Sequence, residues 1–188
     1  MWDSTVPMIG LAMRADTLEN MPVFSVPEGI SWRYFQPGDE RIWAQIEMSA
    51  GEFSCIEDGL KGFRRYYPTD EGLDGRMIFL TENGRPIATA TAWFGETDPG
   101  EGRLHWVSVA ADCQGRGLSK VVVSLAMHRL RQLGYRTAYL TTQTASWVAI
   151  KVYHRFGFHP APISERDAEG WRIVSEKTGI DFMAQLNP

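Results

Sequence analysis

The chain is predicted to pass from a strand into a helix at residues 109–119, which read Val109-Ala110-Ala111-Asp112-Cys113-Gln114-Gly115-Arg116-Gly117-Leu118-Ser119. Two glycines separated by one residue let backbone N–H groups turn outward. There they and the amino end of the following helix can hold an anion. A phosphate-bearing ligand is the natural occupant of such a loop.

Two common phosphate-binding loops do not match this stretch. A dinucleotide-binding fingerprint needs a further glycine or alanine three residues beyond Gly117, where Lys120 stands. A Walker A loop needs a final Gly-Lys-Ser/Thr, which the stretch lacks. These departures disfavour nucleotide binding as the function of the loop.

The segments around the loop alternate between strand and helix patterns. Upstream, the apolar segments 77–80 and 86–94 flank Asn83-Gly84, a strong signal for a two-residue hairpin turn, and residues 104–109 form a further strand. Downstream we expect a helix over 117–133 with a polar stripe (Lys120, Ser124, His128 and Arg131), ended by a left-handed Gly134. A strand over 137–142 and a helix over 147–156, stopped by Gly157, follow.

The outer parts of the chain extend this pattern. Residues 8–13 and 31–35 read as strands, and residues 1–30 as an N-terminal arm. Helices are expected around Ile42 and Ile46 and over the i, i+4, i+7 set at positions 56, 60 and 63. A last strand is expected around Phe158, then a helix or loop through Trp171 and a strand-like segment at 180–182. The order predicts a mixed α/β fold with a right-handed parallel crossover from 104–109 through the helix to 137–142, and a ligand at the carboxyl ends of the strands.

Composition narrows the class of protein. A chain of 188 residues suits a single domain spanning 1–188, which buries roughly 70% of its unfolded surface. A net charge of −4 without a basic stripe argues against a nucleic-acid partner. Cys55 and Cys113 form neither a metal-ligand spacing nor a disulfide framework, so we expect no metal. The N-terminus lacks a signal-peptide pattern, and no apolar stretch approaches the ~20 residues that span a membrane, which predicts a cytoplasmic protein without a membrane partner.

Two motifs together resemble the GNAT superfamily of N-acetyltransferases. The loop 114–119 is similar to its Gln/Arg-x-x-Gly-x-Gly/Ala motif, with Ser119 as a small-residue departure. Residues 146–158 are similar to its Asn-x-x-Ala-x-x-x-Tyr-x-x-x-Gly-Phe pattern, with Ser146 in place of the asparagine. The resemblance covers residues 77–160, the predicted acetyl-CoA-binding core. It implies a mixed, twisted sheet of six to seven strands flanked by about four helices.

The resemblance also implies how acetyl-CoA is bound. The strand ending at Val109 would hold the pantetheine arm through its backbone, and the backbone amide near Val107 would polarise the thioester carbonyl. The pyrophosphate would lie on the amides of residues 114–119, which are Gln114, Gly115, Arg116, Gly117, Leu118 and Ser119. The Arg116 side chain either adds positive charge or is simply solvated. Ser146 either contacts the cofactor or acts as a helix N-cap.

Tyr153 is the candidate general acid. It falls on one helical face with Ala149, Val152 and Phe156, a pattern that by itself favours core packing over a catalytic role. A thiol with a pKa of about 8.5 leaves more easily when a donor such as a phenol, with a pKa of about 10, protonates it. The tyrosine of the family pattern favours the acid role.

The general base is less defined by the sequence. Some relatives carry a glutamate at the position of Arg103, so that assignment fails here. His105 shares a strand face with Val107 and Val109 by two-residue alternation, and it is either the base or a structural strand histidine. Glu101 and Glu96, expected in the preceding loop, are alternatives that act directly or through water.

The predicted activity is therefore transfer of an acetyl group from acetyl-CoA to a primary amine of a small molecule or peptide in a ternary complex. A catalytically weak acyl-CoA-binding or regulatory domain is the alternative, since the asparagine and the strand glutamate are missing. Acidic residues at 52, 57 and 58 either attract a cationic amine or pair with helix dipoles. The resemblance allows a homodimer, and the sequence does not name the acceptor.

Overall fold

The structure is a computed structural model that describes residues 3–69, 72–96, 98–161 and 164–186. Its contacts divide the chain into two compact units. Unit 1 comprises residues 1–22, 94–103 and 130–188, and unit 2 comprises residues 23–93 and 104–129. Because the two units interleave along the sequence, each is built from segments that are distant in the chain.

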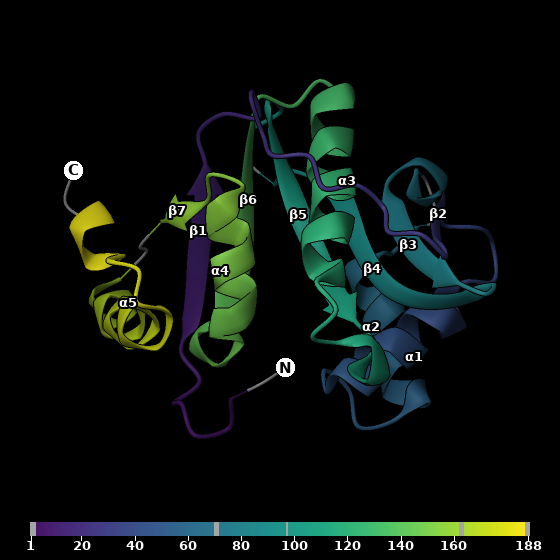
Figure 1. Cartoon of the computed structure of the whole chain (residues 1–188), viewed down its shortest axis with the longest axis horizontal. Coiled ribbons are helices and arrows are strands. Elements are labelled where there is room, and N and C mark those ends of the chain that lie inside the picture. The colour runs from purple at the N-terminus through teal and green to yellow at the C-terminus, as the bar shows by residue number, and fades with distance from the viewer. Residues whose placement is uncertain (1–2, 70–71, 97, 162–163, 187–188) are drawn as a thin grey trace. The chain divides into compact units, whose positions relative to one another are not determined.

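Unit 2 contains an antiparallel set of strands and two of the helices that surround it. Strands β2 (Ile30–Tyr34), β3 (Met77–Glu82) and β4 (Arg85–Phe94) pair in that order, and β5 (Glu101–Val109) follows β4 in the sheet. The β3–β4 turn has Asn83 at φ 49° and Gly84 at φ 79°, which confirms the predicted hairpin with two left-handed residues. Helices α1 (Glu40–Ala50) and α2 (Ile56–Tyr66) pack against each other (Figure 1).

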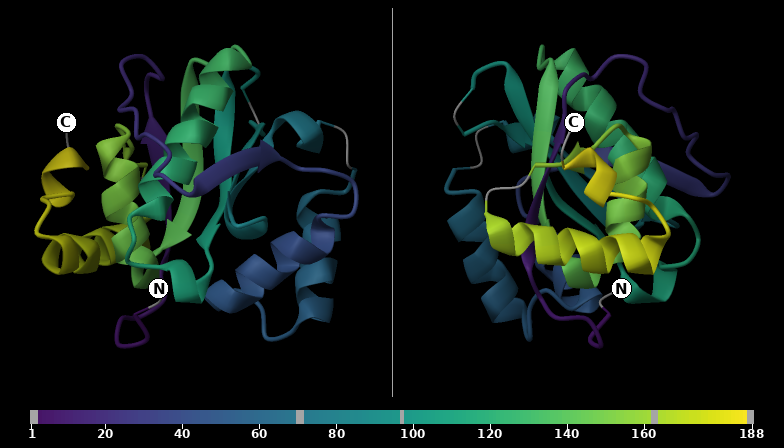
Figure 2. Two further views of the ribbon diagram at one scale, coloured as in Figure 1. Left: turned by 45° about the vertical axis from the view of Figure 1, so that its right-hand side comes forward. Right: turned by 90° about the vertical axis from the view of Figure 1, so that its left-hand side faces the viewer.

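Unit 1 is built around strand β1 (Gly10–Ala15). This strand pairs antiparallel with β6 (Thr137–Gln143) on one side and with the two-residue β7 (His159–Pro160) on the other. Helices α4 (Trp147–Arg155) and α5 (Glu165–Thr178) contact each other, and α5 also packs on β1 (Figure 2). Gly170 permits this packing, since a Cβ there would come within 2.8 Å of Leu11 Cδ2.

Strand β5 takes part in both sets of strands. Its first three residues pair in parallel with β6, from Glu101 opposite Thr137 to Arg103 opposite Tyr139. Helix α3 (Leu118–Gln132) connects β5 to β6, which confirms the predicted parallel crossover, and Gly134 after it has φ 92°. Hydrogen bonding thus runs through seven strands in the order β2-β3-β4-β5-β6-β1-β7, and the predicted mixed α/β fold is confirmed.

The core of unit 2 is dominated by aromatic rings. Trp43 on α1, Phe63 on α2 and Phe79 on β3 are fully buried in one cluster with Phe35 and Tyr67. Trp43 meets Phe63 edge to face at 5.4 Å, and Phe35 stacks on Phe63 at 5.9 Å. This cluster fastens α1 and α2 to the strands.

Three local predictions are corrected by the structure. Strand β5 begins at Glu101 rather than at Leu104, because its first residues find partners on β6. Residues 180–182 are not a strand: Phe182 precedes a 3₁₀ turn (Met183–Gln185) and is buried against Trp171. Ser124 is not on an exposed stripe, since it is buried and its Oγ accepts a hydrogen bond from the N–H of Phe24 in the N-terminal segment.

None of the helices in the described part of the chain is long and apolar enough to cross a membrane.

Candidate functional site

The glycine loop joins the end of β5 to the start of α3 in unit 2. Gly115 has φ 76° and Gly117 has φ 75°, conformations that a side chain strains. A Cβ on Gly115 would meet nothing within 4 Å, so the backbone there is open. The first N–H groups of α3 also lack carbonyl partners within their own helix. The loop can therefore accept an anionic group on its backbone.

The side chain of Gln114 braces this loop. Its Nε2 donates a hydrogen bond of 3.0 Å to the carbonyl oxygen of Val109, the last residue of β5. The amide group thereby ties the loop back to the strand end, and the backbone of the loop is left for a ligand.

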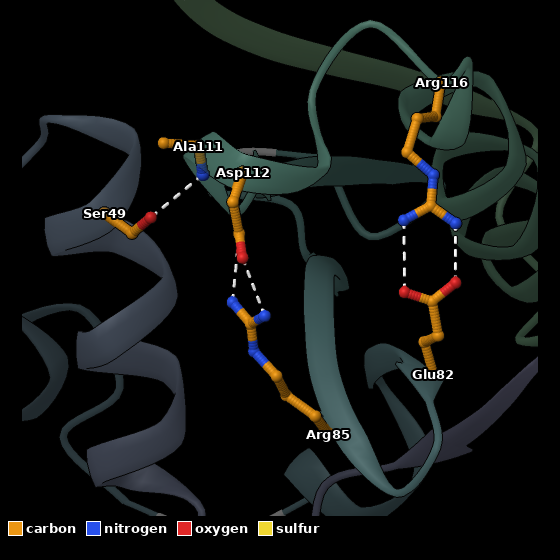
Figure 3. A network of polar contacts seen from close by, with 6 residues as sticks. All are labelled: Ser49, Glu82, Arg85, Ala111, Asp112 and Arg116. Carbon is orange, nitrogen blue, oxygen red and sulfur yellow. Dashed lines mark hydrogen bonds and ion pairs between the residues drawn. The ribbon is translucent and has the colours of Figure 1, made fainter.

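Two ion pairs hold the loop from the β3–β4 hairpin (Figure 3). Arg116 makes a bidentate pair with Glu82, with nitrogen–oxygen distances of 2.6 and 3.1 Å. Arg85 makes a second bidentate pair with Asp112, at 2.7 and 2.9 Å. The guanidinium of Arg116 is thus bound to Glu82 and is not simply solvated. While this ion pair lasts, its positive charge is directed at Glu82. The hydrogen bonds from the arginines hold the pKa of Glu82 and of Asp112 below their usual values.

Strand β5 leaves regular strand geometry just before the loop. Trp106 has φ 46°, a left-handed conformation that is an outlier for a bulky residue and costs on the order of 1–3 kcal/mol. The placement of His105, Val107 and Val109 on one face assumes a regular two-residue alternation along the strand. The left-handed Trp106 interrupts this alternation. His105 is buried beside the rings of Tyr66 (6.0 Å) and Tyr67 (5.7 Å).

A buried carboxyl group on α1, Glu47, was not predicted from the sequence. Its side chain is fully buried, and Ser108 Oγ donates a hydrogen bond of 2.5 Å to its Oε2. Its Oε1 has no hydrogen-bond partner among the described residues. Burial raises the pKa of Glu47 to about 8, although the bond from Ser108 opposes the shift and the Glu52 charge adds to it. A glutamate one turn after Trp43, within the apolar stripe of α1, was the signal in the sequence.

The other predicted residues lie in unit 1. Tyr153 is on α4 and is buried, with its ring 6.3 Å from that of Phe158. The helix ends before Gly157, which has φ 83°. Ser146 occupies the N-cap position of α4, but its side chain makes no capping hydrogen bond and instead accepts one from Gln143 Nε2 at 3.0 Å.

The acidic candidates near the start of β5 are both ion-paired. Glu101 is the first residue of the strand, not part of the preceding loop, and Arg14 Nε lies 3.3 Å from its Oε1. Glu96 is in the loop, and its Oε1 accepts a 2.6 Å hydrogen bond from Arg103. Arg103 thus fixes the carboxylate of Glu96.

The structure therefore groups the predicted residues in two sets. Unit 2 holds His105, Val107, Val109 and the loop 114–119, and unit 1 holds Glu101, Ser146 and Tyr153. Within the described ranges, no group of three or more histidine, cysteine or acidic residues could hold a metal ion. Cys113, which precedes the loop, is buried, and burial raises the pKa of its thiol.

The structure combines a mixed sheet, a parallel crossover and a glycine loop at the amino end of the crossover helix. Together these features define the class of fold. The family model described as "Acetyltransferase (GNAT) family" matches residues 35–158, and the chain belongs to this family. Membership implies acetyl-CoA as the acyl donor, and the open backbone at Gly115 and the left-handed glycines fit its diphosphate.

Individual relatives agree with this assignment. The chain is 28% identical to a mycothiol acetyltransferase from Actinosynnema mirum over 136 residues, covering 71% of this chain and 46% of the relative. It is 28% identical to one from Saccharomonospora viridis, covering 85% and 56%. A solved GCN5-related N-acetyltransferase from Sphaerobacter thermophilus superposes with a TM-score of 0.62 at 25% identity, over 81% of this chain and 48% of that one. The chain thus spans about half the length of the relatives that it matches.

The raised pKa of Glu47 predicts a pH-dependent stability. A carboxyl that binds its proton more tightly in the folded state, with a pKa of about 8 against the ordinary 4.5, stabilises the fold less as pH rises between those values. The free energy of unfolding should therefore fall by up to about 3 kcal/mol from pH 5 to pH 8 through this group. Glu47→Gln, which keeps an acceptor for Ser108, should remove that part of the slope. Urea unfolding of both proteins across this range measures it, and equal slopes would contradict the prediction.

Proposed function

We propose that the protein transfers an acetyl group from acetyl-CoA to a primary amine of a small molecule or peptide, directly, in a ternary complex. The observation that carries the proposal is the sequence of geometries along β5. The strand contains a left-handed residue at Trp106, ends at Val109 and leads into a loop with two left-handed glycines at the start of α3. In a chain of this family, that arrangement suits an acyl-CoA extended along the strand with its diphosphate on the loop.

Binding of the donor uses the backbone more than side chains. The amides of residues 114–119 would receive the pyrophosphate, and the end of β5 at Val109 would pair with the pantetheine arm. The Val107 N–H would donate to the thioester carbonyl oxygen and stabilise the negative charge that develops there. Arg116 would serve to fix the loop, because Glu82 already binds its guanidinium on both nitrogens.

The chemical step needs one proton removed and one supplied. The neutral amine attacks the thioester carbon, the tetrahedral intermediate collapses, and the C–S bond breaks with the electron pair leaving on sulfur. Tyr153 would protonate this thiolate, and the proton lost by the amine nitrogen restores the phenol through solvent. Its place on α4, four residues before Gly157, matches the tyrosine of the family pattern.

His105 is our candidate for the base that deprotonates the amine. It precedes Val107 by two residues on β5, so it is tied to the same strand as the proposed carbonyl donor. Glu101 is on the same strand, but its carboxylate already has a charged partner, because Arg14 Nε lies 3.3 Å from its Oε1. Ser146, bonded to Gln143, would contact the donor only weakly.

The test of the function is calorimetric titration of the protein with acetyl-CoA, followed by thiol release over a panel of amines. The panel comprises antibiotic amines, polyamines, amino acids, peptides with a free N-terminus or lysine, and, because of the names of the relatives, mycothiol-related amines. We expect binding and thiol release with one amine class above the rate without amine. Binding without release on any amine would favour the acyl-CoA-binding alternative, and no binding would contradict the proposal.

Tyr153→Phe removes one hydroxyl and keeps the ring that packs near Phe158. We expect turnover at saturating substrates to fall by roughly 10²-fold, because the thiolate then leaves without its proton donor, while the dissociation constant of acetyl-CoA stays the same. Steady-state kinetics and titration measure the two quantities. Tyr139→Phe, on β6, is a matched control for loss of a tyrosine hydroxyl. Unchanged turnover of the Tyr153 variant would rule out the acid role.

His105→Gln tests the base. A base must be unprotonated to act, so the rate of the unmodified enzyme should rise with pH through the pKa of that base. In the variant we expect a rate lower by roughly 10²-fold and the loss of this acidic limb, whereas Glu101→Gln should keep the limb. The pH dependence of kcat/KM measures both. A limb that is unmoved in His105→Gln and lost in Glu101→Gln would transfer the assignment to Glu101.

A further inference from the structure

Strand β5 contains a residue with a left-handed backbone, Trp106. The φ and ψ angles of a residue together set the orientation of the peptide group that follows it relative to the strand before it, and the group after Trp106 carries the Val107 N–H. At φ 46° a tryptophan persists only if its surroundings over-determine the conformation. The contacts that keep Trp106 in this conformation therefore also set the direction of the Val107 amide.

Those contacts are aromatic and come from α1, α2 and the segment between them. The indole of Trp106 stacks on Phe53 at 5.7 Å with an interplanar angle of 21°. It meets Trp43 of α1 at 5.1 Å and Tyr66 of α2 at 4.8 Å. Trp106, Phe53 and Tyr66 are partly buried and Trp43 is fully buried, and the contacts of the indole with these three rings limit how far it can turn. We call Phe53, Trp43 and Tyr66 the ring clamp.

The residue on the other side of Val107 is also fastened to α1. Ser108 Oγ donates its hydrogen bond to Glu47, which is fully buried and one helical turn from Trp43. A hydrogen bond is directional, so it fixes the rotation of the strand about its own axis at Ser108. Helix α1 thus holds both neighbours of Val107, one through a ring and one through a carboxyl group.

We propose that Trp106 and Glu47 are positioning residues, which aim the Val107 N–H at the thioester carbonyl of acetyl-CoA. The inference rests on the proposed function and adds to it the side chains that make the backbone donor effective. A donor that stabilises developing charge must be preorganised, because a displacement of about 1 Å costs on the order of 10²-fold in rate. Neither side chain touches the substrate; each acts through the backbone of β5.

The measurement must distinguish the positioning role of Trp106 and Glu47 from a role in core packing alone. The Val107 N–H contacts only the acyl carbonyl, so its misalignment changes the polarisation of that bond and not the binding of the rest of the donor. Infrared difference spectra of acetyl-CoA labelled with ¹³C at the carbonyl report the polarisation directly. Titration with CoA, which has no acyl carbonyl, reports the remaining contacts.

The variants form two matched pairs. Trp106→Phe keeps a ring in the clamp, whereas Trp106→Gly removes the ring and accepts the left-handed φ without strain. Glu47→Gln keeps an acceptor for Ser108, whereas Glu47→Leu removes it. Ser108→Ala deletes one hydroxyl and serves if a larger change prevents folding.

In the unmodified protein we expect the bound carbonyl stretch to lie below its value in water. Trp106→Phe and Glu47→Gln should keep this shift. Trp106→Gly, Glu47→Leu and Ser108→Ala should lose most of it and lower kcat by roughly 10- to 100-fold, with the dissociation constant of CoA changed less than about twofold. Folded variants of the second group that keep both the shift and kcat would overturn the inference alone. Failure of the unmodified protein to bind acetyl-CoA would overturn the proposed function, and this inference with it.

Discussion

The attachment of helix α1 to strand β5 is the constraint on which the candidate site depends. Three side chains on α1 reach three successive points: Trp43 meets Trp106, Glu47 accepts a hydrogen bond from Ser108, and Ser49 Oγ accepts one of 2.9 Å from the N–H of Ala111. The helix therefore contacts the strand at its left-handed residue, near its end and in the segment that leads to the glycine loop. Because helix geometry fixes the spacing of these side chains, it also fixes the spacing of the backbone groups that they hold. A strand with a strained residue in its interior keeps its shape only with such support.

The loop beyond Ala111 is held in a different way. The pairs Arg116–Glu82 and Arg85–Asp112 are largely exposed, and exposed ion pairs each contribute little to stability and weaken with salt. Both start from the β3–β4 hairpin, whose tight turn brings Glu82 to Arg116 within the glycine loop and Arg85 to Asp112 just before it. The two bidentate pairs thus fix the orientation of this segment more than they contribute to the free energy of folding. The part of β5 that would meet the acyl group is thus held by ring contacts and a buried hydrogen bond, whereas the part of the chain that would meet the diphosphate is held by exposed ion pairs.

Sequence patterns predicted the elements well where the signal was local. The Asn83-Gly84 turn, the crossover helix and the glycine loop depend on residues close in the chain, and all three are present as expected. The errors come from contacts between distant segments: the first residues of β5 extend the strand because β6 is beside them, and Phe182 is buried against Trp171. The ion-pair partners of charged side chains could not be predicted from the sequence either, because Arg116 and Glu82 are 34 residues apart. The strain at Trp106 has no signature in an alternating pattern, and Glu47 was detectable only as a charge within an apolar stripe.

A carboxyl group at position 47 suits the proposed positioning of β5 better than an apolar side chain would. An apolar side chain would fill the same space without the desolvation that raises the pKa of Glu47, and replacing buried polar groups by apolar ones often raises stability. Apolar contacts, however, tolerate sliding and rotation of a strand, whereas the bond from Ser108 is satisfied in one orientation only. The rings around Trp106 fix position, and the buried carboxyl fixes rotation. At neutral pH the raised pKa keeps this carboxyl mostly protonated, so the orientation is held without a buried charge beside the atoms that would carry the developing negative charge of the reaction.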